Sequence, residues 1–430
     1  MPRFTELTVA STVGQNDIIP LVQNGVTLST TAGAIAALGS GAAGAVNEPR
    51  YVYFDEFFAT GGGGNIAGPG GTDAEKAAAM STWLQNNTGS GPRKSVLYGA
   101  RNYSMPTLPL WSGQKHMGVA PVREYNTGTT WTCAGTNQWS FPGGVNNGGY
   151  SYPAGGAPRD IHLENILFAG GSTKNWLAPQ ATYTAANVLW MSTIHNCGWT
   201  NWLTIIKGYL DGVTLSGVTH IQGCYDTPFT LGGSENNIFG DGFAFMDSAA
   251  AYSIVTGGKP FIDTHMDKSR IGRIMVTSRQ TGYALLVSGG SNQVIDGFAA
   301  DAQATDPTYG AAVKVTGGDG TVFTNCSFKG MATNPASAVG GLAANRGWIH
   351  VTGGSHTIFN GCNWQRSGNS QPLTSFPMVF AGPSVGAGQV KIGLGNGWTG
   401  YGGANGLVQQ STAGQIQTST DTTLTLTTGA

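Results

Sequence analysis

The chain has 430 residues, and its 21 Lys and Arg residues nearly balance 22 Asp and Glu residues, for a formal net charge of -1. A phosphate-binding surface normally shows a basic excess, so this balance argues against a nucleic-acid partner. No segment approaches the roughly 20 apolar residues of a membrane span, and no apolar stretch follows Met1 to Phe4, so we expect cytoplasmic synthesis without membrane insertion or export by the usual signal.

Residues 1–38 are predicted to form a separate small unit. Two alternating segments, Ile18–Gln23 and Val26–Thr30, flank Asn24-Gly25, which is a strong hairpin signal because both turn residues accept positive φ. An Ala-rich helix is expected from Thr31 to Leu38. About 35 residues cannot bury a stable core alone, so this unit needs a partner. Residues 39–50, rich in Gly and Ala, then form a flexible linker.

Residues 51–154 are predicted to open and cap the following domain. Tyr51–Phe54 and Ser95–Tyr98 have the composition of short strands. Between them, Thr72-Asp-Ala-Glu75 forms a capping box, in which the Thr hydroxyl and Glu carboxylate satisfy backbone donors at a helix start. The helix is expected to continue through Leu84 and to end at Asn86.

A repeated phrase identifies the fold of residues 155–400. An apolar pair, Gly-Gly, a second apolar stretch and then Asn or Gly, Cys and an aromatic residue occur in Lys314–Phe328 and again in His350–Trp364, with a weaker copy in Leu286–Phe298. Each copy reads as two short strands joined at the Gly-Gly corner, too small to bury its own apolar face. Copies must therefore stack, which predicts an all-β parallel β-helix.

The cysteines and the C-terminal residues have separate interpretations. Cys197, Cys326 and Cys362 occupy one slot of the phrase and Cys224 a similar one, so the thiols are expected to stack as core residues. The pairing of a zinc site is absent, and no metal or other cofactor is expected. The Thr-rich residues 401–430 read either as a terminal strand that pairs with other subunits or as a disordered tail.

Two parts of the chain carry a family resemblance. The segment from Phe4-Thr-Glu-Leu7 through Asn16–Thr27 to Ala34–Leu38 resembles the virion-docking module of bacteriophage tail fibres and tailspikes. The capping helix followed by strands resembles the start of pectate-lyase-like right-handed β-helices, including those of tailspikes. These proteins usually carry a Pro-x-Gly-x-Tyr turn, whereas this chain has Gly99–Tyr103. The resemblance implies a homotrimer in the virion tail, attached through its N-terminus to other phage tail or baseplate proteins.

Candidate site residues gather in the segment Lys259–Arg273, which is the densest polar stretch. If the backbone is extended, a period of two places Asp263, His265 and Asp267 on one face, with Arg270 and Arg273 close behind. Such a group has the residues to hold a cation or to divide acid and base roles in glycosidic cleavage, with the arginines binding substrate. The alternative interpretation is an exposed ion-pair patch at a corner.

Two tryptophans are further candidates. Trp176 and Trp202 are predicted to contact sugar, because an exposed indole face stacks on the C–H groups of a pyranose.

The sequence therefore leaves two functions open. The first is a phage tail spike or fibre that attaches to the polysaccharide of the host surface. The second is a polysaccharide-degrading enzyme, a lyase or glycoside hydrolase, either carried on the virion or free-standing. Glycan binding without cleavage is the favoured outcome, because no other closely spaced acidic pair is found.

Overall fold

The structure is a computed structural model, and its chain divides into two units, Met1–Arg50 and Tyr51–Ala430. It describes residues 18–23, 26–31, 51–57, 71–85, 94–119, 128–142, 158–182, 187–217, 219–233, 236–241, 244–247, 260–278, 284–302, 313–329, 349–365, 379–399, 406–419 and 424–428. No helix in these ranges is long and apolar enough to cross a membrane.

The first unit contains the predicted hairpin. Strands β1 (Ile18–Gln23) and β2 (Val26–Thr31) pair antiparallel as sheet A, and Gln23 opposite Val26 closes the pairing. The hairpin prediction is therefore confirmed. The expected helix over 31–38 falls, beyond its first residue, outside the described residues, as does the linker over 39–50.

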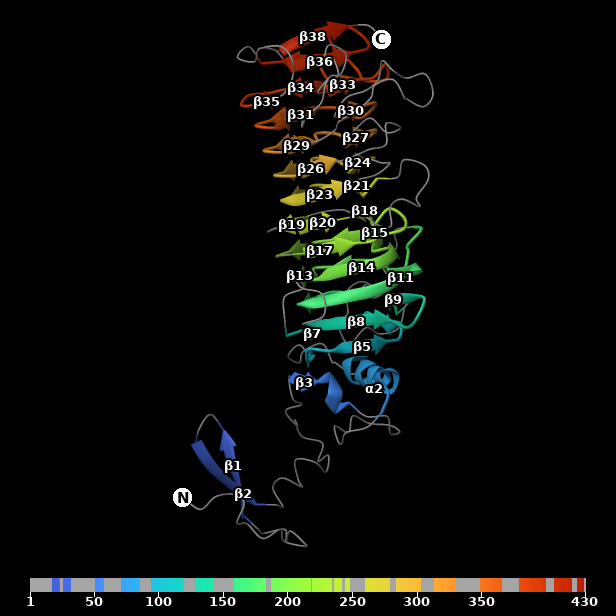
Figure 1. Cartoon of the computed structure of the whole chain (residues 1–430), viewed down its shortest axis with the longest axis vertical. Coiled ribbons are helices and arrows are strands. Elements are labelled where there is room, and N and C mark those ends of the chain that lie inside the picture. Colours follow the sequence, from blue (N-terminus) through green and yellow to red (C-terminus); the bar gives the residue numbers. More distant parts are fainter. Residues whose placement is uncertain are drawn as a thin grey trace. The chain divides into compact units, whose positions relative to one another are not determined.

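The second unit is a right-handed parallel β-helix made of three parallel sheets, and Figure 1 shows its coils stacked along one axis. Each full coil contributes one strand to each sheet in the order D, B, C. Sheet B contains β3 (Tyr51–Tyr53), β4 (Lys94–Leu97), β7 (Gln114–Met117), β10 (His162–Glu164), β13 (Thr193–His195), β16 (Thr214–Ser216), β19 (Ile238–Asp241), β22 (Arg270–Gly272), β25 (Val294–Asp296), β28 (Val322–Thr324), β31 (Thr357–Asn360), β34 (Val390–Ile392) and β37 (Ile416–Thr418).

The other two sheets complete the coils. Sheet C contains β5 (Asn102–Met105), β8 (Thr129–Cys133), β11 (Ile166–Leu177), β14 (Gly198–Thr204), β17 (Thr219–Gln222), β20 (Ala244–Asp247), β23 (Ile274–Ser278), β26 (Ala299–Ala302), β29 (Ser327–Lys329), β32 (Asn363–Gln365) and β35 (Gly397–Thr399), with β6 (Leu108–Pro109) and β9 (Asn137–Ser140) at its side. Sheet D contains β12 (Val188–Trp190), β15 (Ile206–Asp211), β18 (Phe229–Gly233), β21 (Ile262–Met266), β24 (Leu285–Val287), β27 (Val313–Val315), β30 (Ile349–Val351), β33 (Val379–Ala381), β36 (Gly406–Gln410) and β38 (Leu424–Thr428).

Left-handed residues form the corners of the coils and explain the abundance of Gly and Asn. At the corner between sheets D and B, positive φ recurs at Asp160, Met191, Gly212, Asn236, Lys268, Asn292, Gly320, His356, Gly388 and Gly414. At the corner between sheets B and C it recurs at Asn165, Asn196, Gly217, Gly297, Asn325, Gly361 and Gly395. Gly and Asn tolerate this conformation better than other residues, so they are the default corner residues.

The Gly-Gly sequence marks the D-to-B corner, and each of its two positions requires glycine for a different structural reason. A Cβ on Gly317 would lie 2.3 Å from the carbonyl oxygen of Ser288, so this glycine allows close backbone approach between coils. Gly318 has φ of 90°, which only glycine adopts readily. The predicted copy of two strands is corrected to three, because Phe328 lies on β29 in sheet C, beyond a second corner at Asn325.

Both ends of the β-helix differ from the predicted boundaries. Its strands begin at Tyr51, since β3, β4 and β7 already pair in sheet B, so the region 51–154 contains full strands of the solenoid. At the other end, β36 pairs with β33 and β38 pairs with β36 inside this chain. The described strands in residues 401–430 therefore belong to sheets B and D of the solenoid, and contact of this segment with other subunits stays a prediction.

Helix α2 (Asp73–Gln85) covers the first coil, and the short helix η2 (Phe54–Glu56) precedes it (Figure 1). The predicted capping box is confirmed: the Thr72 amide donates to Glu75 at 2.8 Å, and the Glu75 amide donates to the Thr72 hydroxyl at 3.3 Å. Met80, Trp83 and Leu84 turn inward and close the core. All four slot cysteines are buried, as expected.

Candidate functional site

The outer face of strand β21 carries two of the three predicted catalytic residues. Ile262, Thr264 and Met266 are buried, so the alternation of the strand turns Asp263 and His265 outward. The prediction that these two side chains share a face is confirmed. Whether they act on a substrate stays a prediction.

Asp267 does not join them. Strand β21 ends at Met266, and the next corner has φ of 42° at Lys268, which turns the backbone away from the face of sheet D. The Asp267 carboxylate instead accepts a 2.8 Å hydrogen bond from the Ser291 hydroxyl of the next coil. The expected extension from Asp263 to Asp267 is therefore wrong. The alternation of polar residues in the sequence runs on to Asp267, but the strand ends one residue earlier, at the corner.

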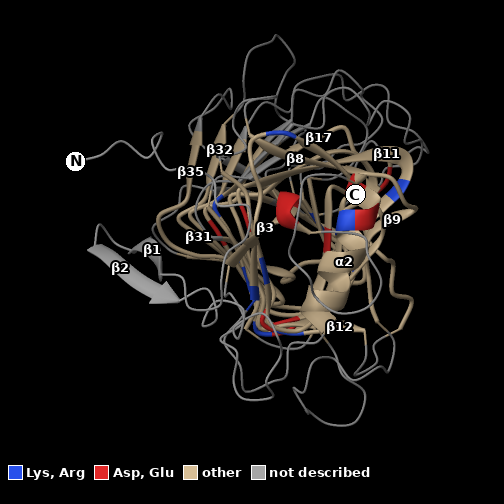
Figure 2. Ribbon diagram, turned by 90° about the horizontal axis from the view of Figure 1, so that it is seen from below, with Lys and Arg blue, Asp and Glu red and all other residues tan. Residues whose placement is uncertain are grey.

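The two arginines lie beyond that corner. Arg270 is the first residue of β22 in sheet B, and its guanidinium donates to Asp296 at 2.6 Å. Arg273 follows β22 and is exposed at the next corner. Figure 2 shows acidic and basic positions together on the side of β31, which belongs to sheet B. The predicted grouping with Asp263 and His265 is corrected, since the arginines occupy a different face.

Asp263 has an unusual environment for a surface carboxylate. Burial raises its pKa above the ordinary value, and this effect outweighs both the hydrogen bond from Ser288 and the nearby His265, which lower it. The Ser288 hydroxyl donates to the carboxylate at 2.5 Å from the adjacent coil. A raised pKa makes the protonated form of a carboxyl group more accessible than it is for an exposed carboxylate.

An aromatic pair completes this face. The rings of Tyr209 on β15 and His265 on β21 meet edge to face with centroids 6.2 Å apart, across the intervening strand β18. Gly232 lies between them in register, and a Cβ there would be 2.5 Å from the His265 ring and 2.8 Å from the Tyr209 ring. The glycine thus makes the ring contact possible. We define the outer-face site as Tyr209, Gly232, Asp263, His265 and Ser288.

Sequence reasoning missed Tyr209, Gly232 and Ser288. Ser288 follows the apolar pair of a recognised repeat, and the pairing of Thr264 with Val287 puts it next to the site, where its hydroxyl reaches Asp263. Tyr209 and Gly232 lie 23 residues apart in a part of the chain where no repeated phrase fixes the register. Only the paired strands bring them together.

The predicted sugar-contacting tryptophans are in the core. Trp202 is fully buried, donates its indole N–H to the Phe168 carbonyl at 2.9 Å and packs over Gly170. Trp176 is also buried, with rings of Phe168 and Trp199 each 5.4 Å away. Their assignment as sugar-binding residues is therefore wrong.

Breaks in strand alternation explain this burial. Trp199 and Trp202 are both inward although three residues apart, because Asn201 has φ of 60° and reverses the alternation of β14. In β11 the register shifts between Gly171 and Asn175, just before Trp176. Neither irregularity is visible in the hydrophobic pattern.

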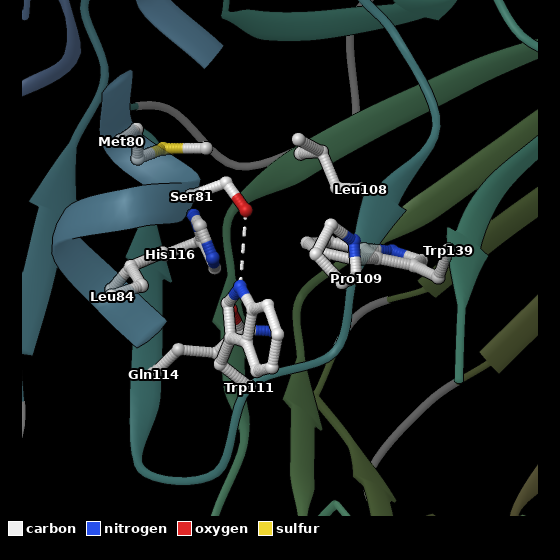
Figure 3. A pocket seen from close by; sticks show the side chains of 9 residues that line it. All are labelled: Met80, Ser81, Leu84, Leu108, Pro109, Trp111, Gln114, His116 and Trp139. Atoms are coloured by element: carbon white, nitrogen blue, oxygen red, sulfur yellow. Dashed lines mark hydrogen bonds between the residues drawn. The ribbon is translucent and has the colours of Figure 1, made fainter. Parts of the chain in front are cut away.

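A small pocket lies under α2, apart from the outer-face site. Figure 3 shows its lining, in which the Trp111 indole donates to the Ser81 hydroxyl at 3.0 Å. Buried polar atoms of Gln114, His116 and Trp139 have no partner among the described residues. Its empty volume of about 140 Å³ is below the range of about 300–1,000 Å³ typical of ligand pockets. The pocket is therefore too small to be the glycan site.

Metal ligation has no support in the described ranges. No group of three or more His, Cys, Asp or Glu residues is arranged there to hold an ion.

Comparisons with known proteins show the fold. No protein-family model matches the chain, and no curated protein sequence matches it significantly. The tailspike of Escherichia coli bacteriophage HK620, solved in complex with a pentasaccharide, aligns over 96% of this chain and 69% of its own, with 9% identity and a TM-score of 0.55. A variant of that tailspike, also with a pentasaccharide, aligns over 94% and 71% at the same identity and TM-score.

A third solved structure is the A-module of the mannuronan C-5 epimerase of Azotobacter vinelandii. It aligns over 88% of this chain and 96% of its own with 12% identity, and its TM-score is 0.47. The tailspike similarities establish that the chain shares the right-handed parallel β-helix of a phage tailspike.

Proposed function

We propose that this protein is a bacteriophage tail spike that attaches to polysaccharide of the host surface through the outer-face site on sheet D. The observation that carries the proposal is the Tyr209–His265 ring pair beside the hydrogen-bonded Asp263 and Ser288. The fold shared with a phage tailspike, solved with a pentasaccharide bound, supports it. So does the resemblance of residues 4–38 to a virion-docking module.

The chemistry of the outer-face site suits a sugar. A pyranose presents apolar C–H groups to an aromatic ring and hydroxyl groups to polar side chains. Tyr209 and His265 supply ring surface and polar tips, and Asp263 and Ser288 supply acceptor and donor groups one coil apart. Adjacent strands lie about 4.8 Å apart, which is close to the length of one sugar, so a glycan along the axis meets a new strand with each residue.

The carboxylates favour binding over hydrolysis. Asp263 lies on the outer face of β21, whereas Asp267 follows the end of that strand and accepts a hydrogen bond from Ser291, so the two carboxylates do not share a face. Glycoside hydrolases hold their two carboxyl groups about 5–9.5 Å apart. Within the described outer face of sheet D, Asp211 at the end of β15 is two strands from Asp263 and also offset along the strand. Asp263 is therefore the one carboxylate of the outer-face site as defined above.

A binding and digestion assay tests this proposal. Purified surface polysaccharides from a panel of bacteria are immobilised, and the wild type is compared with Asp263→Asn, His265→Ala and the control Lys391→Ala, an exposed change in sheet B. We expect wild type and control to bind one polysaccharide without shortening it, and both site variants to bind at least tenfold more weakly. Unchanged binding by both site variants would move the glycan site elsewhere.

A polysaccharide-degrading enzyme is the second candidate, and the raised pKa of Asp263 is the observation that favours it. The same assay separates the two candidates through the size of the recovered polysaccharide. Cleavage by the wild type that Asp263→Asn abolishes would assign an enzyme, with Asp263 as its acid. His265 would then be a second candidate catalytic group, and Asp267→Asn would test Asp267 separately.

Assembly of the spike is also part of the proposal. We propose a homotrimer that joins other tail or baseplate proteins through residues 1–38. Mass photometry is expected to give three times the 44.4 kDa of one chain, and a stable monomer would contradict the homotrimer.

Deleting residues 1–44 should leave the melting temperature nearly unchanged and abolish incorporation into particles, because the hairpin belongs to a separate unit.

A further inference from the structure

A second polar cluster lies on the outer face of sheet B, away from the outer-face site. Glu164, His195 and Ser216 occupy one column on the consecutive strands β10, β13 and β16, and they are direct register partners. Each strand has the alternation outward, inward, outward, so all three side chains leave the core in the same direction. Their inward neighbours Leu163, Ile194 and Leu215 are buried and hold the column in place.

A hydroxyl and an imidazole are in contact within this column. The Ser216 hydroxyl oxygen lies 2.9 Å from Nδ1 of His195, which is hydrogen-bonding distance. Gly217 has φ of 74°, and a Cβ there would be 2.7 Å from Cε1 and 2.9 Å from Nδ1 of His195. The ring therefore packs on the Gly217 backbone, which fixes Nδ1 beside the hydroxyl. With Nδ1 as the acceptor, the other ring nitrogen carries the proton.

A carboxylate lies beside this pair. Glu164 is one strand, about 4.8 Å, from His195 in the same column. Its Oε2 is 2.9 Å from Nε2 of His162 and 4.0 Å from Nζ of Lys115, which orient it on the surface. Burial lowers the pKa of His162 below its usual value, which favours its neutral form. The negative charge of Glu164 would stabilise a positive charge that develops on the His195 imidazole.

We propose that Ser216 and His195 form a nucleophile and general-base pair that hydrolyses acyl esters, with Glu164 as a positioning residue. The Ser216 oxygen bonds to the ester carbonyl carbon while its proton passes to Nδ1 of His195, and this proton leaves with the alcohol. Water then attacks the acyl-serine and gives a proton to Nδ1, which returns it to the serine oxygen as the carboxylic acid leaves. A nucleophile, a base in contact with it and a third group beside the base are the elements of this chemistry.

The residue types favour an ester over a glycosidic bond. Hydrolysis of a glycosidic bond usually needs two carboxyl groups, and this column supplies one carboxylate, one imidazole and one hydroxyl. The substrate class is an ester of a small carboxylic acid, such as an O-acyl group on a polysaccharide. This activity does not depend on the outer-face site, because the column lies on a different sheet.

Two measurements on the full chain test the ester site. In the first, a fluorophosphonate probe is added and the modified residue is located by peptide mass spectrometry. In the second, p-nitrophenyl acetate hydrolysis is followed for the wild type, Ser216→Ala, His195→Ala and the control Thr214→Ala, which changes the neighbouring outward position of β16. Circular dichroism confirms that each variant is folded.

We expect the probe to label Ser216, and we expect Ser216→Ala and His195→Ala each to lower the hydrolysis rate at least a hundredfold. Thr214→Ala should keep the wild-type rate. Glu164→Gln should lower kcat about tenfold with little change in KM, and should shift the pH profile of the reaction. Absence of the label from Ser216, or folded Ser216→Ala with the wild-type rate, would overturn the proposal. If a variant fails to fold, the label on the wild type decides.

Discussion

The first coils of the β-helix and the coils around β24 to β34 fill the same cross-section in different ways. Among the first coils, the Trp131 ring lies 4.9 Å from Tyr98, 5.3 Å from His116 and 5.5 Å from both Trp139 and Phe168. In the later coils, identical residues stack in register, with Val315 on Val351 in sheet D and Phe323 on Phe359 in sheet B. The same backbone trace therefore accepts either one large aromatic cluster or columns of identical residues in register.

The aromatic cluster of the first coils buries polar atoms that lose their hydrogen bonds to water. Nε1 of Trp131, Trp139, Trp176 and Trp199 is buried without a partner among the described residues, and each such group loses its hydrogen bonds to water. The strands there are also longer, with 12 residues in β11 against three in β27. The later coils repeat one corner geometry, and among their described residues Nε1 of Trp364 and Oγ1 of Thr321 are also buried without a partner. Stability should therefore depend on individual rings in the first region and on exact stacking in the second.

The largest effect is expected from a charge in the aliphatic column. Val351→Asp buries a carboxylate beside Val315, at a cost of several kcal/mol, and should abolish soluble folded protein. Lys391→Asp, an exposed change in β34, is the control and should fold normally. Soluble yield and circular dichroism measure both. A normally folded Val351→Asp would mean that the inward register of these coils is wrong by one residue.

The next largest effect is a difference in unfolding free energy between a truncation in the first coils and one in the later coils. Trp131→Ala leaves a large cavity among four neighbouring rings and should cost about 3–5 kcal/mol in unfolding free energy. Val315→Ala removes only two methyl groups and should cost about 1–2.5 kcal/mol. Chemical denaturation of both variants gives the difference. Equal losses would show that the aromatic cluster adds no more than one aliphatic position does.

A pH effect should originate in the aromatic region. His116 is fully buried against the Tyr98 hydroxyl at 2.7 Å, and burial lowers its pKa to about 3. The unfolded chain binds this proton near pH 6.5, so the stability contributed by neutral His116 is complete above that pH and is lost as the pH falls toward 3. The melting temperature of His116→Gln should therefore fall less between pH 7 and 4 than that of the wild type. Parallel curves for the two proteins would contradict the buried neutral state.

The smallest effect concerns the cap. Arg101 donates to Asp55 at 2.6 Å and to Asp73 at 2.9 Å, and its guanidinium lies 3.7 Å from the Tyr103 ring centroid. Because the group is partly exposed, Arg101→Met should cost about 1 kcal/mol, less in 1 M salt. Hydrogen exchange should become faster in α2 and β5 but not in β30, since coils contact only their neighbours. Faster exchange along the whole chain would contradict this local role.

The sequence allowed the coils to be predicted where the same corner residues recur, and the coils without recurring corner residues were missed. Gly290, Gly318 and Gly354 have φ of 82°, 90° and 81°, so one backbone requirement recurs three times and made these coils recognisable. The strands before residue 155 have no such phrase, and the structure identifies them only through pairing. Of the candidate site, Asp263 and His265 follow from alternation within one strand. Tyr209 could not be predicted, because its contact with His265 crosses two coils.

The most direct test of the proposed glycan site is hydrogen exchange of the full chain with and without the polysaccharide that it binds. The proposal expects slower exchange in β15, β18, β21 and β24, the strands that carry or adjoin Tyr209, Asp263, His265 and Ser288. Exchange in sheet C should be unchanged, and Asp263→Asn should show no protection at the same polysaccharide concentration. Protection confined to sheet C, or equal protection of wild type and variant, would contradict a glycan site on the outer face of sheet D.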